Sequence, residues 1–529
     1  MKVGLGKKGR EKKGKKTEEP SVEELVDVLK LKKHRLQENY EVVESYPLKP
    51  PFSYALIVRD RSEGEFFYLL DEIPLDQQER EVFTGLKEVL EAELKAPEEG
   101  ESPVESFQKQ FPEIVAKSKK ITTGLTSVGT RKISYYLERD VAGFGKIDPL
   151  MFDPNIEDIS SNGVNKPIFL WHRKYENLKT NLSFRDEEEL DNFVMRLVHK
   201  AGKHVSIAFP TVDATLPGKH RLAIYYKKEI TPLGTSFTIR KFREDPLTVV
   251  DLINNETFST DVAAYLWLLV ENKLSSMIIG ATGAGKTTSL NAIAGLIHPQ
   301  HKIITVEEVA EINLIRENWV STVSRAGFGI ENAGRIELYD LIKSAVRHRP
   351  DWIIVGEIRG EEAYVLFQAL ATGHGGLCTM HAEDPETAIK RLTQPPMNIP
   401  ETIIPLMHCV ISVKHVKAPV LVSYGKSISK RKFVKISEVE GSNRVNDVLV
   451  WDSSSDTYRS DLSNSYLFRK ISQKWGLPLT YVHEEFERRK EVLNYLVEKN
   501  IRSYSSIARF LNQFYSDPEV TYQEILETR

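Results

Sequence analysis

The sequence predicts an α/β protein with a parallel-rich sheet, preceded by a smaller α+β region. Between about residues 247 and 415, short apolar segments such as 352–355 alternate with segments of helical periodicity. Directly after one of them, residues 280–288 read GATGAGKTT and fill every fixed position of the phosphate-loop pattern G-x-x-x-x-G-K-[ST]. The alternation predicts the parallel sheet, and the loop indicates what is bound at its edge.

The chain is 529 residues long, which is more than a single domain with one hydrophobic core usually contains. A polar stretch at residues 240–246, which ends in a proline, marks a hinge between two halves. We expect a disordered basic tail at 1–20, a helical and mixed subdomain at 21–122, an α+β domain at 123–245, an α/β core at 246–415, and a C-terminal extension of strands and then helices at 416–529.

The first 20 residues carry eight Lys or Arg and three Glu, a net charge of +5 in a chain whose total is −3. With so few apolar residues, the tail cannot offset its ordering entropy, so we expect disorder. It also lacks the apolar region of a signal peptide. The tail could bind anionic lipid or an acidic partner, or it could be a solubilising tail with no specific partner.

The longest apolar run, residues 262–270, is far shorter than a membrane-spanning helix. Cys378 and Cys409 are isolated and form no CxxC pair, so neither a disulfide framework nor a structural zinc site is expected. These features favour a soluble or peripheral protein of a reducing cytoplasm.

The phosphate loop has the flanks that such a loop needs, a short apolar strand at 276–279 and a helical segment at 289–297. Its glycines let successive N–H groups and a helix N-terminus point at phosphate oxygens. Lys286 supplies a point charge and Thr287 a hydroxyl for Mg²⁺. The expected nucleotide-binding residues are Gly280, Ala281, Thr282, Gly283, Ala284, Gly285, Lys286, Thr287 and Thr288.

Two further segments place carboxylates at strand ends. Glu307, Glu308 and Glu311 follow the strand expected at 302–306, where they could polarise water or hold Mg²⁺ through water, or form only a solvated acidic turn. Glu357 follows a wholly apolar strand and a glycine, so its carboxylate should emerge beside Mg²⁺ and the γ-phosphate, where many phosphate-loop enzymes have Asp.

A fourth segment, residues 371–382, carries His374 and His381 on either side of a probable strand. Seven residues apart, their side chains should lie on opposite faces, so joint metal binding is not expected. Taken singly, either histidine is more often structural.

In this order, the four segments resemble the Walker A, Asp box, Walker B and His box of the type II and type IV secretion ATPase superfamily, hexameric motors of pilus assembly, secretion and the archaellum. The resemblance runs from about Asp148 to the C-terminus. It implies a RecA-like ATPase core that uses ATP and Mg²⁺.

The resemblance also implies residue roles. Lys286 and Thr287 would bind phosphate and Mg²⁺, and Glu357 would lie at Mg²⁺ and the γ-phosphate. Glu307 would be the catalytic glutamate, and His374 and His381 would couple nucleotide state to the subunit boundary. Glu308 stands where the family usually has Asp, a departure that keeps the carboxylate.

Residues 153–159 and 235–242 resemble the family's N-terminal domain, whose arginines reach the phosphates. This implies that Arg221 and Arg240 are arginine fingers, because a planar cation stabilises the charge of a transferring phosphoryl group. Without the resemblance, both would be ordinary surface arginines.

The C-terminal part, with RVNDVLVWD at 444–452, resembles the archaeal branch, which includes archaellum motors and pilus or secretion ATPases. The expected assembly is therefore a cytoplasmic homo-hexamer, peripheral at the inner face of the membrane, whose partner is an integral-membrane platform protein.

Two other classes fit the loop less well. A ring-shaped nucleic-acid motor would need a basic surface, but the body is acidic and residues 430–432 form only a short Lys-Arg-Lys cluster, so we expect no nucleic-acid partner. A GTP switch would need an NKxD segment after the loop, whereas Asn165-Lys166-Pro167 precedes it.

Overall fold

The computed structural model describes residues 39–528 except 99, 244, 326–333, 424–425 and 442–443, with the main chain alone for the rest of 417–429. The chain divides between Lys241 and Phe242 into two compact units. The basic tail and the helical segment expected from Ser21 lie outside the described residues.

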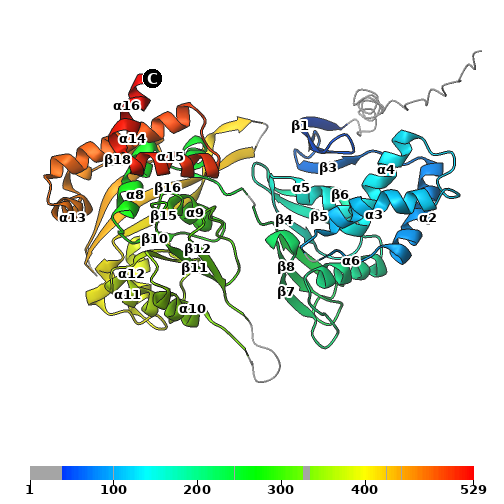
Figure 1. The fold of residues 1–529 in the computed structure, drawn as a ribbon, viewed down its shortest axis with the longest axis horizontal. Helices are drawn as coiled ribbons and strands as arrows, with labels where there is room; N and C mark the ends of the chain where they lie inside the picture. The colour runs from blue at the N-terminus through cyan, green and yellow to red at the C-terminus, as the bar shows by residue number, and fades with distance from the viewer. Residues whose placement is uncertain are drawn as a thin grey trace, which may run out of the picture. The chain divides into compact units, whose positions relative to one another are not determined.

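The first unit is built on a nine-stranded sheet with the order β1-β2-β3-β6-β5-β4-β9-β8-β7 (Figure 1). Neighbouring strands are antiparallel except β3 and β6, which run parallel. The sheet is continuous across the boundary expected near residue 122. The strands are β1 (Tyr40–Lys49), β2 (Ser53–Asp60), β3 (Phe66–Glu72), β4 (Ile156–Ser161), β5 (Pro167–His172), β6 (Glu176–Ser183), β7 (Thr211–Thr215), β8 (Arg221–Tyr225) and β9 (Ser236–Arg240).

Helices α5 (Asp148–Phe152) and α6 (Glu187–Lys200) share the core of this sheet. Asp186 caps α6 by accepting the Glu189 N–H, and Leu190, Phe193 and Leu197 bury the apolar face of the helix. A separate apolar cluster holds together α2 (Gln77–Glu93), α3 (Pro103–Lys117) and α4 (Ser127–Leu137).

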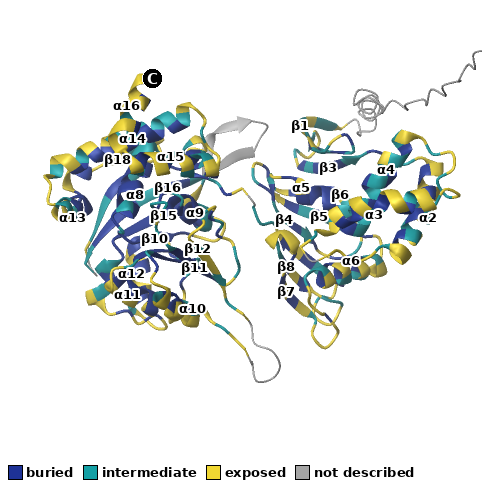
Figure 2. Cartoon of the chain, in the orientation of Figure 1, coloured by how far each residue is buried: buried dark blue, intermediate teal, exposed yellow. Residues whose placement is uncertain are grey.

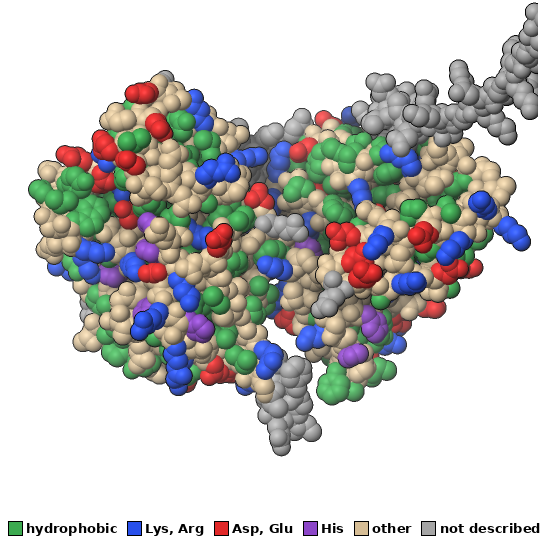
Figure 3. All heavy atoms as spheres, viewed as in Figure 1, with side chains coloured by type: hydrophobic (Ala, Val, Ile, Leu, Met, Phe, Trp, Pro, Cys, Tyr) green, Lys and Arg blue, Asp and Glu red, His purple; other side chains and the backbone are tan. Residues whose placement is uncertain are grey.

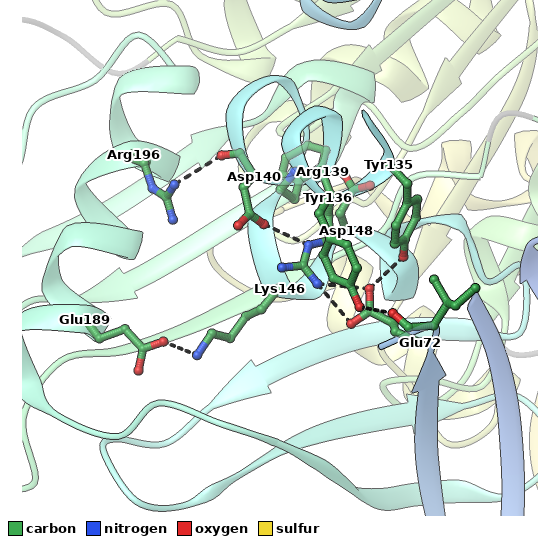
Figure 4. Close-up of polar contacts among 11 residues, drawn as sticks. Glu72, Tyr135, Tyr136, Arg139, Asp140, Lys146, Asp148, Glu189 and Arg196 are labelled. Carbon is green, nitrogen blue, oxygen red and sulfur yellow. Dashed lines mark hydrogen bonds and ion pairs between the residues drawn. The ribbon is translucent and has the colours of Figure 1, made fainter. Parts of the chain in front are cut away.

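A polar network fastens this helical cluster to the sheet (Figure 4). Glu72, the last residue of β3, accepts hydrogen bonds from the Tyr135 hydroxyl at 2.6 Å and from Arg139 Nη1 at 2.9 Å. Tyr136 donates to the Ile73 carbonyl at 2.6 Å. Helix α4 ends at Leu137, and the chain continues as a π-helical turn, Glu138–Ala142, which carries Arg139.

The second unit contains another nine-stranded sheet, ordered β12-β11-β13-β14-β10-β15-β16-β17-β18. Pairing is parallel from β12 through β15 and antiparallel from β15 through β18. The predicted α/β fold with a parallel-rich sheet is confirmed. The strands are β10 (Ser276–Ile279), β11 (Ile303–Glu307), β12 (Trp319–Val323), β13 (Trp352–Val355), β14 (Gly375–Met380), β15 (Cys409–Ser423), β16 (Lys426–Gly441), β17 (Arg444–Asp452) and β18 (Thr457–Ser460).

Helices cover both faces of this sheet, and its strands β10, β11, β13 and β14 are buried along their whole length (Figure 2). One face packs against α7 (Val249–Asn254), α8 (Thr260–Glu271), α9 (Lys286–Ala294), α13 (Tyr466–Trp475), α14 (Leu479–Glu498), α15 (Tyr504–Ser516) and α16 (Pro518–Thr528). The other packs against α10 (Leu338–Ala345), α11 (Glu362–Ala371) and α12 (Pro385–Thr393).

The apolar run at 262–270 lies within α8, where every one of its residues is buried against the sheet and the C-terminal helices. Among the residues that the structure describes, no helix combines the length and apolar character needed to cross a membrane. The boundary expected at 415/416 falls inside β15, so the C-terminal strands continue the sheet of the preceding core.

Candidate nucleotide-binding site

The phosphate loop connects β10 to α9 at the carboxyl edge of the parallel strands. Gly280 lies against β15, where an added Cβ would be 2.4 Å from the Val413 carbonyl oxygen. Gly285 is the residue before α9 and has a φ of +94°, in the left-handed region. These two glycines let the main chain turn tightly enough for the N-terminus of α9 to open at the edge of the sheet.

Lys286, the first residue of α9, is only 8% exposed. Its ammonium donates to the carbonyl oxygens of Gly280 and Ala281, both at 3.1 Å. Burial lowers the pKa of Lys286, and the Glu357 carboxylate opposes that effect. The Lys286 ammonium is thus held inside the phosphate loop. Thr287 follows it on the first turn of α9 and is half-buried.

Glu357 and His381 reach the same edge from the neighbouring strands β13 and β14. Lys286 Nζ lies 3.3 Å from the His381 ring nitrogens, and His381 Nε2 lies 3.4 Å from Glu357 Oε1. Burial, and then the charge of Lys286, lower the pKa of His381, which favours the neutral imidazole. We assign the tautomer in which Nε2–H faces Glu357 and Nδ1 accepts from Lys286.

Glu307 ends β11 and is 2% exposed. Its Oε1 accepts the backbone N–H groups of Glu311 at 2.9 Å and Ile312 at 2.8 Å, which fixes the carboxylate. An added Cβ at Gly356 would lie 3.1 Å from Glu307 Cγ, so the glycine before Glu357 makes room for the Glu307 side chain.

Glu308 turns away from Glu307 and forms an ion pair with Arg359. The three carboxylates at this strand end do not converge, and no group of metal-binding side chains occurs in the part of the chain that the structure describes. The oxygen donors of Thr287 and Glu357 nevertheless suit Mg²⁺, which keeps several waters and takes few protein ligands.

His374 lies at the other end of β14. Its Nδ1 is 3.0 Å from both the Thr372 hydroxyl and the Ala369 carbonyl oxygen, so it caps the end of α11. The two histidines therefore lie at opposite ends of the strand, and the expectation that their side chains face opposite sides stays a prediction. The six residues of β14 span about 20 Å, which separates His374 from the phosphate loop of its own chain.

Arg221 and Arg240 belong to the first unit, where they are register partners on β8 and β9. Arg221 pairs with Asp213 at 2.7 Å, and Arg240 Nε donates to Asp158 at 3.1 Å. Their side chains are 40% and 55% exposed. Both therefore present guanidinium groups on an exposed face of the first sheet.

Two arginines at the site were not among the site residues expected from the sequence. Arg431 on β16 donates from Nε to the Gly283 carbonyl at 3.1 Å, and Arg391 donates to the His381 carbonyl. The basic cluster at 430–432 was visible in the sequence, but only strand pairing determines which of its cations faces the loop.

The comparison with protein families matches residues 141–447 to the family described as type II/IV secretion system protein. An uncharacterized Methanocaldococcus jannaschii protein, MJ0900, is 37% identical over 393 residues, which cover 73% of this chain and 70% of the relative. A putative conjugal transfer protein of Mycobacterium tuberculosis, Rv3659c, is 32% identical over 256 residues, covering 47% and 72% respectively.

Similar solved structures include the Legionella pneumophila ATPase DotB, at 18% identity and a TM-score of 0.41, covering 71% of this chain and 92% of that one. The pilus retraction motor PilT with bound ADP has 18% identity and a TM-score of 0.38, covering 52% and 78%. The family match spans more than half of the chain, so this chain belongs to the type II/IV secretion system protein family.

Proposed function

We propose that the chain is an ATPase that hydrolyses ATP with Mg²⁺ and works as a hexameric motor for secretion or for assembly of a type IV pilus-like filament or archaellum. The observation that carries the ATPase assignment is the meeting of Lys286, His381 and Glu357 at one edge of the sheet. There, a buried cation can bind phosphate oxygens and a carboxylate can hold Mg²⁺, the two positive charges that a phosphoryl transfer needs, with a neutral imidazole between them.

In the proposed reaction, water attacks the γ-phosphorus and the bond to the bridging oxygen breaks, releasing ADP and inorganic phosphate. Lys286 would bind phosphate oxygens, and Thr287 and Glu357 would hold Mg²⁺, in part through water. Glu307 would accept the proton of the attacking water, because its backbone hydrogen bonds fix the carboxylate before reaction. Bound Mg²⁺ would neutralise charge on the transferring group.

The motor assignment rests on the family and on the names of the relatives, which include a pilus retraction motor and conjugal transfer proteins. The proposed partner is an integral-membrane platform protein. The chain would meet it at the inner face of the membrane, where residues 1–20 would bind anionic lipid.

On the face drawn in Figure 3, acidic and basic side chains are interspersed. Lys430 pairs with Glu256 and Lys432 with Asp456, which weakens the case for a nucleic-acid surface.

Phosphate release from ATP by purified protein tests the enzymatic proposal. Wild type should hydrolyse ATP only with Mg²⁺, and Lys286→Ala should lower turnover at least about hundredfold. Lys343→Ala, an exposed lysine on α10, serves as the matched control and should keep wild-type turnover. Normal hydrolysis by Lys286→Ala would refute the site.

Native mass spectrometry with a non-hydrolysable ATP analogue tests the ring, for which a mass of six chains is expected. Capture of a polytopic membrane protein from the source membrane tests the partner. Turnover stimulated by DNA but unaffected by membranes would instead support the nucleic-acid motor.

A further inference from the structure

The β15–β16 ribbon extends past the end of β10 and runs beside the phosphate loop. Ile279, the last residue of β10, pairs with Ser412, and β15 continues to Ser423. Along this extension, His415 is the register partner of Arg431 on β16. The ribbon therefore brings side chains of a distant part of the sequence to the loop.

Arg431 makes two contacts with the loop. Its Nε donates to the Gly283 carbonyl oxygen at 3.1 Å. Its stem lies over Gly285, where an added Cβ would be 3.0 Å from Arg431 Cδ. Because Gly285 has no side chain, the loop can turn tightly and Arg431 can also approach it closely.

The cations on either side of Arg431 are engaged elsewhere. Lys430 pairs with Glu256, and Lys432 is 2.5 Å from Asp456. Because successive side chains alternate along a strand, the two lysines point away from the face that Arg431 occupies. Arg431 is the member of this cluster that the ribbon directs at the phosphate loop.

The position of Arg431 differs from that of the other charged groups of the site. β10 has β14 on one side and β15 on the other, so His381 and Glu357 approach the loop from the β14 side and Arg431 from the β15 side. Its position on the side away from Glu357 favours a role in holding the nucleotide over a role in transfer of the γ-phosphate.

We propose that Arg431 is a positioning residue for nucleotide binding, which fixes the Gly283 carbonyl outward and places a permanent positive charge beside the phosphates. With this carbonyl held outward, the N–H groups of the loop stay directed inward at the anion. The inference rests on the proposed nucleotide site. It assigns Arg431 to the binding of ATP and ADP alike, and not to the hydrolytic step.

Equilibrium binding of ADP and ATP, together with turnover at saturating ATP, tests this assignment on the full chain. Arg431→Ala should weaken both nucleotides about tenfold, as expected for loss of one charge-assisted contact, while maximal turnover changes less than about twofold. Arg431→Lys, which keeps the charge and a donor, should recover most of the affinity, and Arg431→Gln should not. Lys430→Ala is the matched control and should bind like wild type.

Nucleotide-free thermal unfolding separates positioning from support of the fold. The melting temperature should stay near that of wild type in Arg431→Ala, while the rise on adding ADP shrinks. Unchanged ADP affinity, loss of turnover at unchanged affinity, or equal destabilisation without nucleotide in Arg431→Ala and Arg431→Lys would each overturn the proposal. If wild type itself binds no ADP, the proposed function fails with it.

Discussion

At the scale of single residues, the Gly356-Glu357 pair explains how two carboxylates share one edge. A Cβ at position 356 would lie only 3.1 Å from Glu307 Cγ, closer than two carbons ordinarily pack. The Gly356 carbonyl in turn accepts from the Thr379 hydroxyl at 2.7 Å, which fixes the turn after β13. The Glu307 side chain therefore needs a glycine at position 356, because any larger residue would take the space that it occupies.

Gly356→Ala should displace the Glu307 side chain and lower maximal turnover about tenfold or more, with ATP affinity changed less than about threefold. Steady-state phosphate release and ATP binding measure the two effects. Because the new methyl group acts through Glu307, the effect should vanish in a Glu307→Gln background. Additive losses in the double variant would show that Gly356 matters for another reason.

The sequence predicted the residues of the site that belong to a local pattern. Lys286 and Glu357 were recognisable because a strand end and a neighbouring glycine define each of them within a few residues. The contact of His381 with both, and of Arg431 with Gly283, depends on strand order and on register between distant segments. Neither strand order nor register can be read from local periodicity.

At the scale of elements, a buried carboxylate ties the C-terminal helices to the sheet. Glu438 on β16 is fully buried and accepts from the Tyr265 hydroxyl at 2.7 Å and the Ser465 hydroxyl at 2.5 Å. It also accepts the backbone N–H groups of Tyr466 at 2.6 Å and Leu467 at 3.3 Å, at the start of α13. The negative charge faces the N-terminus of a helix, where it is stabilising.

Glu438→Gln should lower the free energy of unfolding by about 2–3 kcal/mol, because the amide NH₂ opposes groups that donate. Urea unfolding with matched slopes measures the difference. Glu440→Gln on the same strand, whose partner Arg444 is largely exposed, is the control and should change stability by less than about 1 kcal/mol. Equal effects of the two substitutions would contradict the capping role.

Most elements of the second unit followed from alternating apolar segments, and β10 and β13 match their expected bounds. The full length of β15 could not be predicted in this way. Its outer half pairs with β16 and lies beyond the apolar run at the start of the strand. The strand β1, half-exposed along its length, gave no apolar signal.

At the scale of the whole molecule, the chain consists of two units, each with its own sheet and core. The phosphate loop, Glu307, Glu357 and His381 belong to the second unit. Arg221 and Arg240 belong to the first, where their side chains are exposed and pair with carboxylates. The predicted role of these arginines at the phosphates makes turnover, rather than nucleotide binding, the quantity that depends on the first unit.

Arg240→Ala should lower turnover at least about hundredfold while ATP affinity stays within about threefold, the pattern of an arginine that stabilises the transferring phosphoryl group. Arg185→Ala, an exposed arginine of the same unit, should leave both quantities unchanged. Parallel loss of affinity and turnover would assign Arg240 to the bound ground state, and no loss would return it to a surface ion pair with Asp158.

The measurement that tests the central claim most directly compares ATP binding with phosphate release in Glu357→Gln. The claim that Glu357 acts at the γ-phosphate of a hydrolysed ATP predicts binding within about threefold of wild type and turnover at least about hundredfold lower. Glu383→Gln, an exposed glutamate after β14, should match wild type in both. Hydrolysis at the wild-type rate by Glu357→Gln would contradict the account.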